Sequence, residues 1–216
     1  MTDTQRKKEK AALIVAELEK EYPEAICSLV YEKPYELLIS TRLSAQCTDA
    51  RVNIVTKELF EVYPTLEALT KASPEEIEKI IRPCGLGNTK ARDIAAMTKM
   101  LAENYNSIVP DNLDELLKLP GVGRKTANLI IGDVFKKPAI VCDTHCIRIT
   151  NLLGLSVGKN AAVVEKQLKE VLEPEKSNDF CHRLVLHGRA VCKAGRPDCK
   201  NCCVKDYCDY ALGQLS

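Results

Sequence analysis

The segment CKAGRPDCKNCCVKDYC, residues 192–208, holds five of the chain's eleven cysteines. Four of these follow the spacing C-x6-C-x2-C-x5-C, and they are Cys192, Cys199, Cys202 and Cys208. Four thiolates in so short a loop suit either a tetrahedral zinc ion or a [4Fe–4S] cluster. Zinc ribbons usually pair two C-x2-C knuckles across a longer gap, so a single knuckle favours the iron–sulfur cluster. Ligation through Cys203 instead of Cys202 would give x3 and x4 spacings, and it stays open as an alternative.

A second stretch whose residues could bind a ligand or react is LPGVGRKTA, residues 119–127, which separates two helical patterns. It is not a P-loop, because Gly121 and Lys125 are too close and follow a helix. It is not a dinucleotide-binding fingerprint either, because the third glycine and the preceding strand are missing. Lys125 falls in the first turn of the following helix, at the positive end of its dipole. That position disfavours the ammonium form and favours an amine that can act as a nucleophile.

The chain repeats this device. PCGLGNTKARDIA, residues 83–95, also has two glycines one residue apart, then a basic residue and an apolar helical pattern. Two such hairpins indicate a repeated structural element rather than a flexible linker. Glycine is also a frequent helix cap, and this is the alternative interpretation of the first hairpin.

Composition limits the class of protein. The chain is 45% hydrophobic and 28% charged, as an ordinary globular protein is, and it lacks Trp, so we expect an aliphatic core. No apolar run is long enough for a bilayer, and no signal peptide is evident, so we expect a cytoplasmic protein without membrane contact. In a reducing compartment the clustered cysteines would bind metal rather than form disulfides. Most of the scattered cysteines are expected to be small buried hydrophobes, and these six are Cys27, Cys47, Cys84, Cys142, Cys146 and Cys181.

The net charge of +1 does not by itself indicate a nucleic-acid-binding protein. Charge is nevertheless uneven, because residues 183–205 contain a single acid, Asp198. A local basic patch can bind a polyanion even on a nearly neutral molecule, although a solvated face is the simpler interpretation of such a patch alone. The basic residues in this segment are Arg183, Arg189, Lys193, Arg196, Lys200 and Lys205.

Amphipathic helical patterns recur along the whole chain, and runs of alternating β-branched residues are nearly absent. The breaks between patterns carry helix-ending or turn-forming residues, as in YPE, ASPEE, VPDN and LEPEK. The sequence therefore predicts an all-α protein. Helices are expected at about 9–22, 34–45, 50–62, 74–82, 88–104, 112–119, 124–136, 143–153, 160–173 and 178–191, after a frayed N-terminus.

Taken together, these motifs resemble the endonuclease III family of base-excision DNA glycosylases, over about residues 34–210. LPGVGRKTA resembles the family's helix-hairpin-helix motif, and the cysteine spacing its iron–sulfur signature. LSAQCTDARVN (43–53), VCDTHCIR (141–148) and LHGR (186–189) resemble three further segments of the family. The order and separation of all five motifs make the resemblance specific.

The resemblance implies a mechanism and a set of roles. Lys125 would attack C1′ of a flipped nucleotide and form a Schiff base, and β-elimination would then nick the strand. Asp143 would assist Lys125 or stabilise charge on the sugar, although it is also a suitable helix N-cap. The glycines of the hairpin, Gly121 and Gly123, would let backbone N–H groups approach a DNA phosphate.

Other DNA contacts follow from the same resemblance. Gln46 and Leu86 would fill the gap that a flipped base leaves in the duplex and would wedge the base stack. An ordinary polar position in a helix is the alternative for Gln46. The cluster would shape the basic loop that carries Lys193, Arg196 and Lys200, so that Arg196 meets the DNA backbone. Asp49 and His145 match family positions without a firm role, and His182 and His187 are expected to be structural or to contact phosphate.

Two positions depart from some relatives and bear on which damaged bases fit. Leu117 stands where a glutamate is expected near the lesion pocket, and Gly87 stands where a larger aromatic residue follows the wedge. The resemblance implies removal of oxidised pyrimidines such as thymine glycol from duplex DNA. Two other activities compete with it. Adenine glycosylases lack the lysine nucleophile and usually carry a further C-terminal domain, and a non-catalytic DNA-binding or redox module gives no reason for pairing Lys125 with Asp143.

The expected architecture has two helical domains with the DNA groove and active site between them. One domain is a six-helix barrel over 27–137 that carries both hairpins. The other combines 1–26 with 138–216 and carries the [4Fe–4S] cluster. The expected partner is double-stranded DNA with damaged bases or abasic sites, bound by a monomer that is nucleoid-associated if the source is bacterial.

Overall fold

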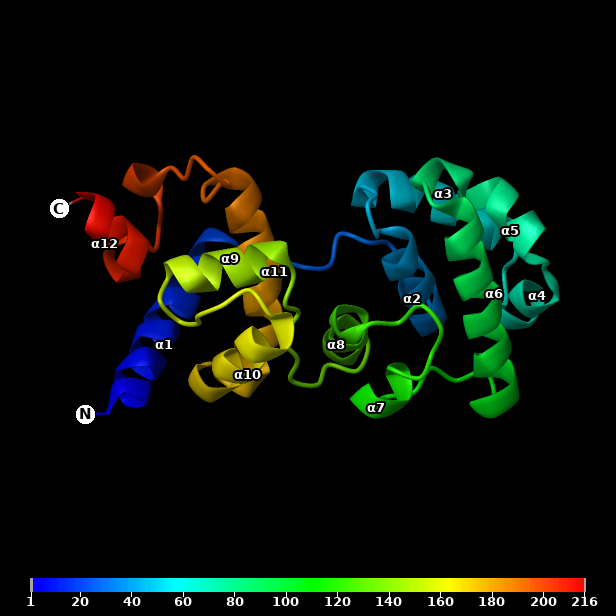
Figure 1. Ribbon diagram of the computed structural model, residues 1–216, viewed down its shortest axis with the longest axis horizontal. Coiled ribbons are helices and arrows are strands. Elements are labelled where there is room, and N and C mark those ends of the chain that lie inside the picture. Colours follow the sequence, from blue (N-terminus) through cyan, green and yellow to red (C-terminus); the bar gives the residue numbers. More distant parts are fainter. Residues whose placement is uncertain (1, 216) are drawn as a thin grey trace. The chain divides into compact units, whose positions relative to one another are not determined.

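The computed structural model describes residues 2–215, with side chains through residue 213. Every regular element in this part of the chain is a helix, which confirms the all-α prediction (Figure 1). The α-helices are α1 (Asp3–Glu21), α2 (Pro34–Leu43), α3 (Asp49–Val62), α4 (Leu66–Lys71), α5 (Pro74–Ile81), α6 (Gly87–Asn104), α7 (Leu113–Leu116), α8 (Arg124–Asp133), α9 (Thr144–Leu152), α10 (Ala161–Val171), α11 (Ser177–Ala190) and α12 (Asp209–Leu215). Four short 3-10 helices join them: η1 (Arg82–Cys84), η2 (Pro174–Lys176), η3 (Cys199–Asn201) and η4 (Lys205–Tyr207).

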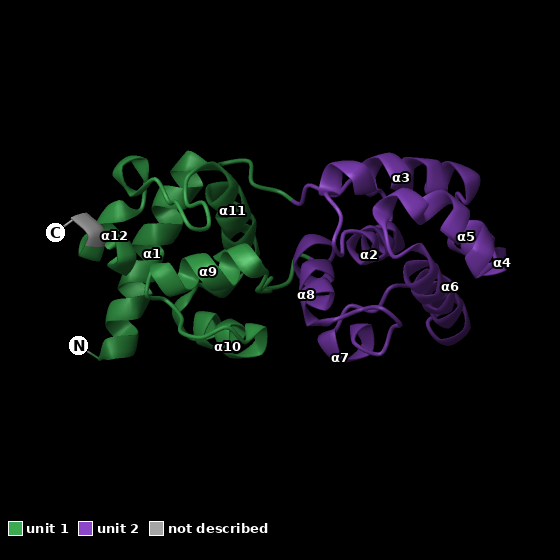
Figure 2. Cartoon of the chain, turned by 45° about the horizontal axis from the view of Figure 1, so that its top comes forward, with its two compact units in different colours: residues 1–26, 136–216 green, residues 27–135 purple. Residues whose placement is uncertain are grey.

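The chain forms two compact units (Figure 2). Unit 2 spans Cys27–Phe135 and so ends two residues before the expected boundary at residue 137. Unit 1 combines residues 1–26 with residues 136–216. Both glycine hairpins and Lys125 therefore belong to unit 2, whereas Asp143 and the cysteine loop belong to unit 1.

Unit 2 is built around α2, which packs against α3, α6 and α8. Seven of the ten residues of α2 are buried, and Leu37, Leu38 and Ile39 are fully so. A helix that is buried on nearly all sides lies in the centre of its domain. Helices α4 and α5 both pack on α6 and complete this core. The turn that carries Gln46 follows α2, and the turn that carries Leu86 precedes α6, so both extend from helices of this core.

Unit 1 is held together by α1, which packs against α10 and α11, while α9 packs against α11. Ile14 and Leu18 of α1 are fully buried, as are Phe180 and Leu184 of α11. The N-terminal helix thus completes a core whose other helices come from the second half of the chain. At roughly 25 cal/mol per Å² of apolar surface removed from water, such side chains supply most of the driving force for this assembly.

Three features of the helix pattern differ from the sequence expectation. The charged N-terminus was expected to fray, but α1 begins at Asp3 because the Thr2 hydroxyl accepts the Gln5 N–H at 3.2 Å. Helix α4 was missed because it has only six residues, although Thr65 caps it. Helix α12 was also missed, and a hydrogen bond between Lys10 and Asp209 joins it to α1.

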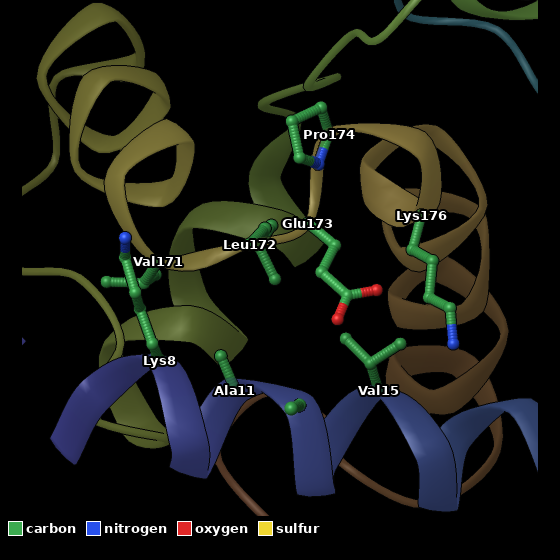
Figure 3. Close-up of a pocket in the computed structure, with 9 residues that line it drawn as sticks. Lys8, Ala11, Val15, Val171, Leu172, Glu173, Pro174 and Lys176 are labelled. Carbon is green, nitrogen blue, oxygen red and sulfur yellow. The ribbon is translucent and has the colours of Figure 1, made fainter. Parts of the chain in front are cut away.

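No helix in the described part of the chain is both long and apolar enough to cross a bilayer. Unit 1 has a surface pocket between α1 and the segment that joins α10 to α11 (Figure 3). Ala11 and Val15 form its apolar floor, and Lys8, Glu173 and Lys176 stand around it. None of the predicted site residues lines this pocket.

Candidate active site and DNA-binding elements

The helix-hairpin-helix motif consists of α7, the turn at residues 117–123, and α8. Two backbone hydrogen bonds tighten the turn: Leu119 N–H donates to Leu116 O at 3.2 Å, and Val122 N–H donates to Leu119 O at 3.1 Å. Leu119 and Val122 are buried, so the turn is anchored to the core of unit 2 by side chains on its inner side. The hairpin is therefore an ordered element and not a flexible linker.

The two glycines of this hairpin are required for different reasons. Gly121 has φ +73°, and a Cβ there would lie 2.9 Å from Arg42 Cδ and 3.0 Å from Asp93 Cβ. Arg42 and Asp93 form a close ion pair, with Nε and Nη2 each 2.7 Å from Oδ2, directly beneath the turn. Gly123 has an ordinary φ of −96° and faces open space. Gly121 thus permits close packing, whereas Gly123 leaves room for a ligand.

This difference predicts that substituting alanine at the two glycines has unequal effects on the stability of the protein. Gly121→Ala should destabilise the protein by about 1–3 kcal/mol, because the left-handed backbone disfavours a side chain and the methyl group overlaps the Arg42–Asp93 pair. Gly123→Ala should leave the free energy of unfolding within about 0.5 kcal/mol of wild type, since its methyl group meets nothing. Urea unfolding of both variants measures this, and equal destabilisation would contradict the account.

Helix α8 begins at Arg124, and its N-cap residue, Gly123, supplies no side-chain cap. Its first intrahelical hydrogen bond runs from Ala127 N–H to Gly123 O at 2.9 Å, so the preceding N–H groups point out of the helix end. Arg124 and Lys125 in this first turn are exposed. An uncapped helix start next to an open glycine is a favourable place for a phosphate group. Lys125 stands on this same exposed turn.

The first glycine hairpin joins η1 to α6 and presents Leu86 to solvent. Gly85 has φ +71° and Leu86 has φ +51°, and Leu86 is 56% exposed. A leucine in the left-handed region is uncommon, and such strain concentrates at functional sites. The alternative interpretation of this first hairpin was a simple glycine helix cap. In the structure its glycines belong to a turn that exposes the apolar side chain of Leu86. A Cβ on Gly87 would lie 3.1 Å from Glu78 Cγ, so a larger residue there requires Glu78 to move.

Gln46 lies in the turn between α2 and α3, not in a helix, so the alternative of an ordinary helical polar residue is wrong. Its φ is +57° and its side chain is exposed. Gln46 and Leu86 are therefore two exposed residues of unit 2 that share a left-handed backbone. This conformation cannot be predicted from the residue types, since neither glutamine nor leucine favours the left-handed region.

Asp143 is the N-cap of α9 in unit 1, which confirms the structural role expected for it. Its Oδ1 accepts the Cys146 N–H at 2.7 Å, and the residue is half-buried. The cap hydrogen bond uses one oxygen of the carboxylate and does not occupy the other. A capping role and an electrostatic role are therefore compatible.

Two of the recognised motifs pack directly on each other in unit 1. A Cβ on Gly188 of the LHGR segment would lie 2.3 Å from His145 Nδ1 and 3.0 Å from Ile149 Cδ1. Gly188 is therefore required so that α9 and α11 can approach closely. His145 acts as a packing residue between these helices, two positions after Asp143. Sequence spacing gave no sign of this contact.

The four predicted cysteine ligands line one small cavity of unit 1. The remaining lining is largely apolar and includes Ile149, Leu152, Leu153, Val191 and Val204. Cys203 is not part of this lining. Burial raises the pKa of the Cys203 thiol, and the nearby carboxylates of Glu21 and Glu17 raise it further. The structure therefore favours the ligand set Cys192, Cys199, Cys202 and Cys208 over one that includes Cys203.

Polar groups beside these sulfurs complete the surroundings. Arg148 donates to Cys192 O at 2.6 Å and to its Sγ at 3.5 Å. His187 is buried, and burial followed by the Arg148 charge lowers its pKa to about 4, so the imidazole is neutral. Tyr22 Oη lies 3.2 Å from His187 Nδ1 and can donate to it, which leaves Nε2–H for Cys202 Sγ at 3.4 Å.

These donors are of the kind that orient metal-bound thiolates. Together with four sulfurs around an apolar cavity, they fit a cluster held by cysteine. Among the described residues, no three or more His, Cys, Asp or Glu side chains form a group that could hold a single metal ion. His187 is thus placed as a neighbour of the cysteine sulfurs, in agreement with its expected structural role.

The basic segment is only partly a surface patch. Lys193, Arg196 and Lys200 are exposed on the cysteine loop, as a role in meeting a polyanion requires. Arg183 is an exception: it is buried, donates to Tyr22 O at 3.2 Å and pairs with Glu19 at 3.6 Å. Arg183 therefore ties α11 to α1 and does not belong to the patch.

Comparison with known proteins decides the family. Residues 39–174 match the HhH-GPD superfamily of base excision DNA repair proteins, a segment that includes both hairpins, Lys125 and Asp143. Endonuclease III of Rickettsia prowazekii (strain Madrid E) is 41% identical over 197 residues, covering 91% of this chain and 93% of that protein. The chain belongs to the endonuclease III family.

The resemblance found in the motifs is thereby confirmed. Endonuclease III of Escherichia coli (strain K12) is 39% identical over 203 residues, covering 94% of this chain and 96% of that protein. A solved structure of a trapped endonuclease III–DNA covalent intermediate has a TM-score of 0.89, 41% identity and full coverage of both chains. A thermostable thymine-DNA glycosylase shares the fold, with a TM-score of 0.83 at 23% identity. This chain is therefore a bifunctional DNA glycosylase and AP lyase of base excision repair.

Proposed function

We propose that this endonuclease III family member removes oxidised pyrimidines such as thymine glycol from duplex DNA, with Lys125 as the nucleophile. The observation that carries the proposal is the exposed lysine in the uncapped first turn of α8, directly after the glycine hairpin. A DNA phosphate bound at that helix end would bring the neighbouring sugar to the lysine. The related structure of a trapped covalent protein–DNA intermediate supports a covalent route.

The chemistry follows from an amine at C1′. The Lys125 amine attacks C1′ of the extruded nucleotide, the bond to the base breaks, and the base leaves with the bonding electrons and takes up a proton. Opening of the sugar ring gives a Schiff base between Nζ and C1′. Loss of a C2′ proton then expels the 3′ phosphate by β-elimination, and water releases the lysine. Asp143 would stabilise positive charge on the sugar as the base departs.

The remaining predicted residues would bind and deform the duplex. Gln46 and Leu86 would occupy the space that the extruded base leaves, which offsets an unstacking cost of a few kcal/mol. Cys192, Cys199, Cys202 and Cys208 would hold a [4Fe–4S] cluster that, when bound, fixes the shape of the loop carrying Arg196. We further propose that the enzyme acts as a monomer and, in a bacterial cell, at the nucleoid.

Base release from defined duplexes tests the substrate. We expect single-turnover excision from a duplex with one thymine glycol to exceed excision from the matched undamaged duplex by at least about 10³-fold, since undamaged thymine is costly to extrude and a poorer leaving group. Chromatography of the released base measures this. Equal rates on both duplexes, or cleavage of abasic duplex only, would contradict the proposed substrate.

Asp143→Asn separates the two roles of this residue. Asparagine caps helices about as well as aspartate, so the free energy of unfolding should stay within about 0.5 kcal/mol of wild type. The single-turnover excision rate should fall by about 10²–10³-fold, because the amide carries no charge to stabilise the sugar cation. Urea unfolding and base release measure the two effects. A loss of stability without a loss of rate would restrict Asp143 to the capping role.

A further inference from the structure

Lys90, the basic residue that follows the first glycine hairpin, is a fully buried lysine of unit 2. It lies in the first turns of α6, with 0% of its surface exposed. Its Nζ donates to three backbone oxygens, those of Leu43, Ala45 and Cys84, each at 2.8 Å. An ammonium group has three N–H donors, so all of them are used inside the protein. Lys90 is therefore not available to contact phosphate or to act as a second nucleophile.

The three acceptors come from the two turns that present the exposed left-handed residues. Leu43 ends α2 and Ala45 directly precedes Gln46. Cys84 ends η1, two positions before Leu86. The backbone of Lys90 adds a further link, because its N–H donates to Leu86 O at 3.1 Å. One residue thus joins the turn of Gln46 to the turn of Leu86.

A charged group at this place needs an explanation beyond core packing. Burial lowers the pKa of Lys90, and an unpaired ammonium in the interior is costly. The carbonyls at the C-terminal end of α2 carry partial negative charge, which favours a cation there. An apolar side chain would fill the space without desolvating a charge, but it would leave these carbonyls without their donor. The lysine therefore fixes backbone geometry that an apolar residue cannot fix.

We propose that Lys90 is a positioning residue for base extrusion, which sets the spacing at which Gln46 and Leu86 enter the duplex. The inference rests on the proposed function, in which these two side chains replace the extruded base. Lys90 acts through the two turns and touches neither DNA nor the reacting sugar. Its loss should therefore impair extrusion of a stacked base more than cleavage at an abasic site, where no base has to be unstacked.

Lys90→Met tests this, because methionine is unbranched and lacks N–H donors. The control is Lys99→Met, on the same helix, where Lys99 is exposed and pairs with Glu103. In Lys90→Met we expect single-turnover excision of thymine glycol to fall by at least about tenfold, with cleavage of preformed abasic duplex within about threefold of wild type. Fluorescence of 2-aminopurine beside the lesion should lose the increase that reports unstacking. Lys99→Met should match wild type in all three assays.

A double-mutant cycle with Gln46→Ala distinguishes positioning from a merely structural role. If Lys90 positions Gln46, then Gln46→Ala should reduce excision less in the Lys90→Met background than in wild type. Additive losses, or a Lys90→Met variant that behaves like Lys99→Met, would overturn the inference. Should Lys90→Met fail to fold by circular dichroism, Lys90→Gln, which keeps two N–H donors, replaces it throughout the cycle.

Failure of the proposed function would look different. In that case wild type itself would release no thymine glycol, whereas the inference alone fails when wild type is active and Lys90→Met equals it. The 2-aminopurine signal decides the role of Lys90 in either case, since it reports unstacking without chemistry. An unchanged signal in Lys90→Met would overturn the inference even if no base is released.

Discussion

Replacing Lys125 by alanine is expected to abolish strand cleavage at abasic sites while leaving the fold intact. Lys125 is exposed in the first turn of α8, and alanine is a good helix former, so the free energy of unfolding should change by less than about 0.5 kcal/mol. The rate of β-elimination should fall by about 10³-fold or more, because no amine remains to form the Schiff base. Gel electrophoresis of cleaved abasic duplex measures the rate.

Lys125→Arg is the matched control for charge. Arginine keeps the positive charge at the end of α8 but is not a nucleophile at neutral pH. It should therefore bind abasic duplex about as tightly as wild type and cleave it no better than Lys125→Ala. Lys118→Ala removes a different exposed lysine of the motif, one that pairs with Glu115 at 2.6 Å, and should cleave normally. Cleavage by Lys125→Ala at the wild-type rate would contradict the assigned nucleophile.

Replacing Cys202 by serine is expected to prevent assembly of the cluster, whereas the same change at adjacent Cys203 should not. The Cys202 side chain lines the cavity shared with the other three cysteines, and that of Cys203 does not. Iron should fall from about four atoms per chain to near zero in Cys202→Ser. Because cluster binding and folding are linked, this variant should also melt at a lower temperature.

Iron and sulfide analysis, the visible absorption band and thermal melting together measure these effects. Cys203→Ser should keep the wild-type iron content, since its thiol lies near Glu17 and Glu21 and away from the cavity. Cys202→Ser should also bind DNA more weakly, because the exposed Arg196 stands on the loop that the cluster shapes. Loss of iron in Cys203→Ser but not in Cys202→Ser would contradict the ligand set. Stoichiometric zinc in place of iron would contradict the cluster itself.

Much of the fold could be predicted because helix boundaries in this chain carry local signals. Ser73 before Pro74 marks the start of α5, where the Ser73 hydroxyl accepts the Glu76 N–H at 3.2 Å. Asp143 marks the start of α9 in the same way. The elements that were missed are the short helix α4 and the C-terminal helix α12, whose stability depends more on packing than on pattern.

The candidate site was predictable where it depends on residue type and not where it depends on tertiary contact. Lys125 could be singled out because a lysine in the first turn of a helix lies at the unfavourable, positive end of the helix dipole. The burial of Lys90 could not be predicted, because in the sequence NTKARD it resembles any exposed helical lysine. Only its hydrogen bonds to carbonyls distant in the sequence reveal that it is buried. Likewise, the need for glycine at 121 follows from the Arg42–Asp93 pair, which no local pattern shows.

The cysteine loop illustrates the same limit. Spacing identified a four-cysteine site but could not choose between Cys202 and Cys203, since adjacent residues differ only in the direction of their side chains. That direction is set by the turn between η3 and η4 and by packing against α1. Arg183 was grouped with the surface cations for a similar reason, although its guanidinium joins α11 to α1.

Borohydride trapping tests the central claim most directly. The enzyme would be incubated with a thymine glycol duplex in the presence of borohydride, and the cross-linked peptide would be sequenced by mass spectrometry. The account predicts a stable adduct on Lys125 for wild type and no adduct for Lys125→Ala. An adduct on another lysine, or none with either thymine glycol or abasic duplex while the protein is folded and binds DNA, would contradict it.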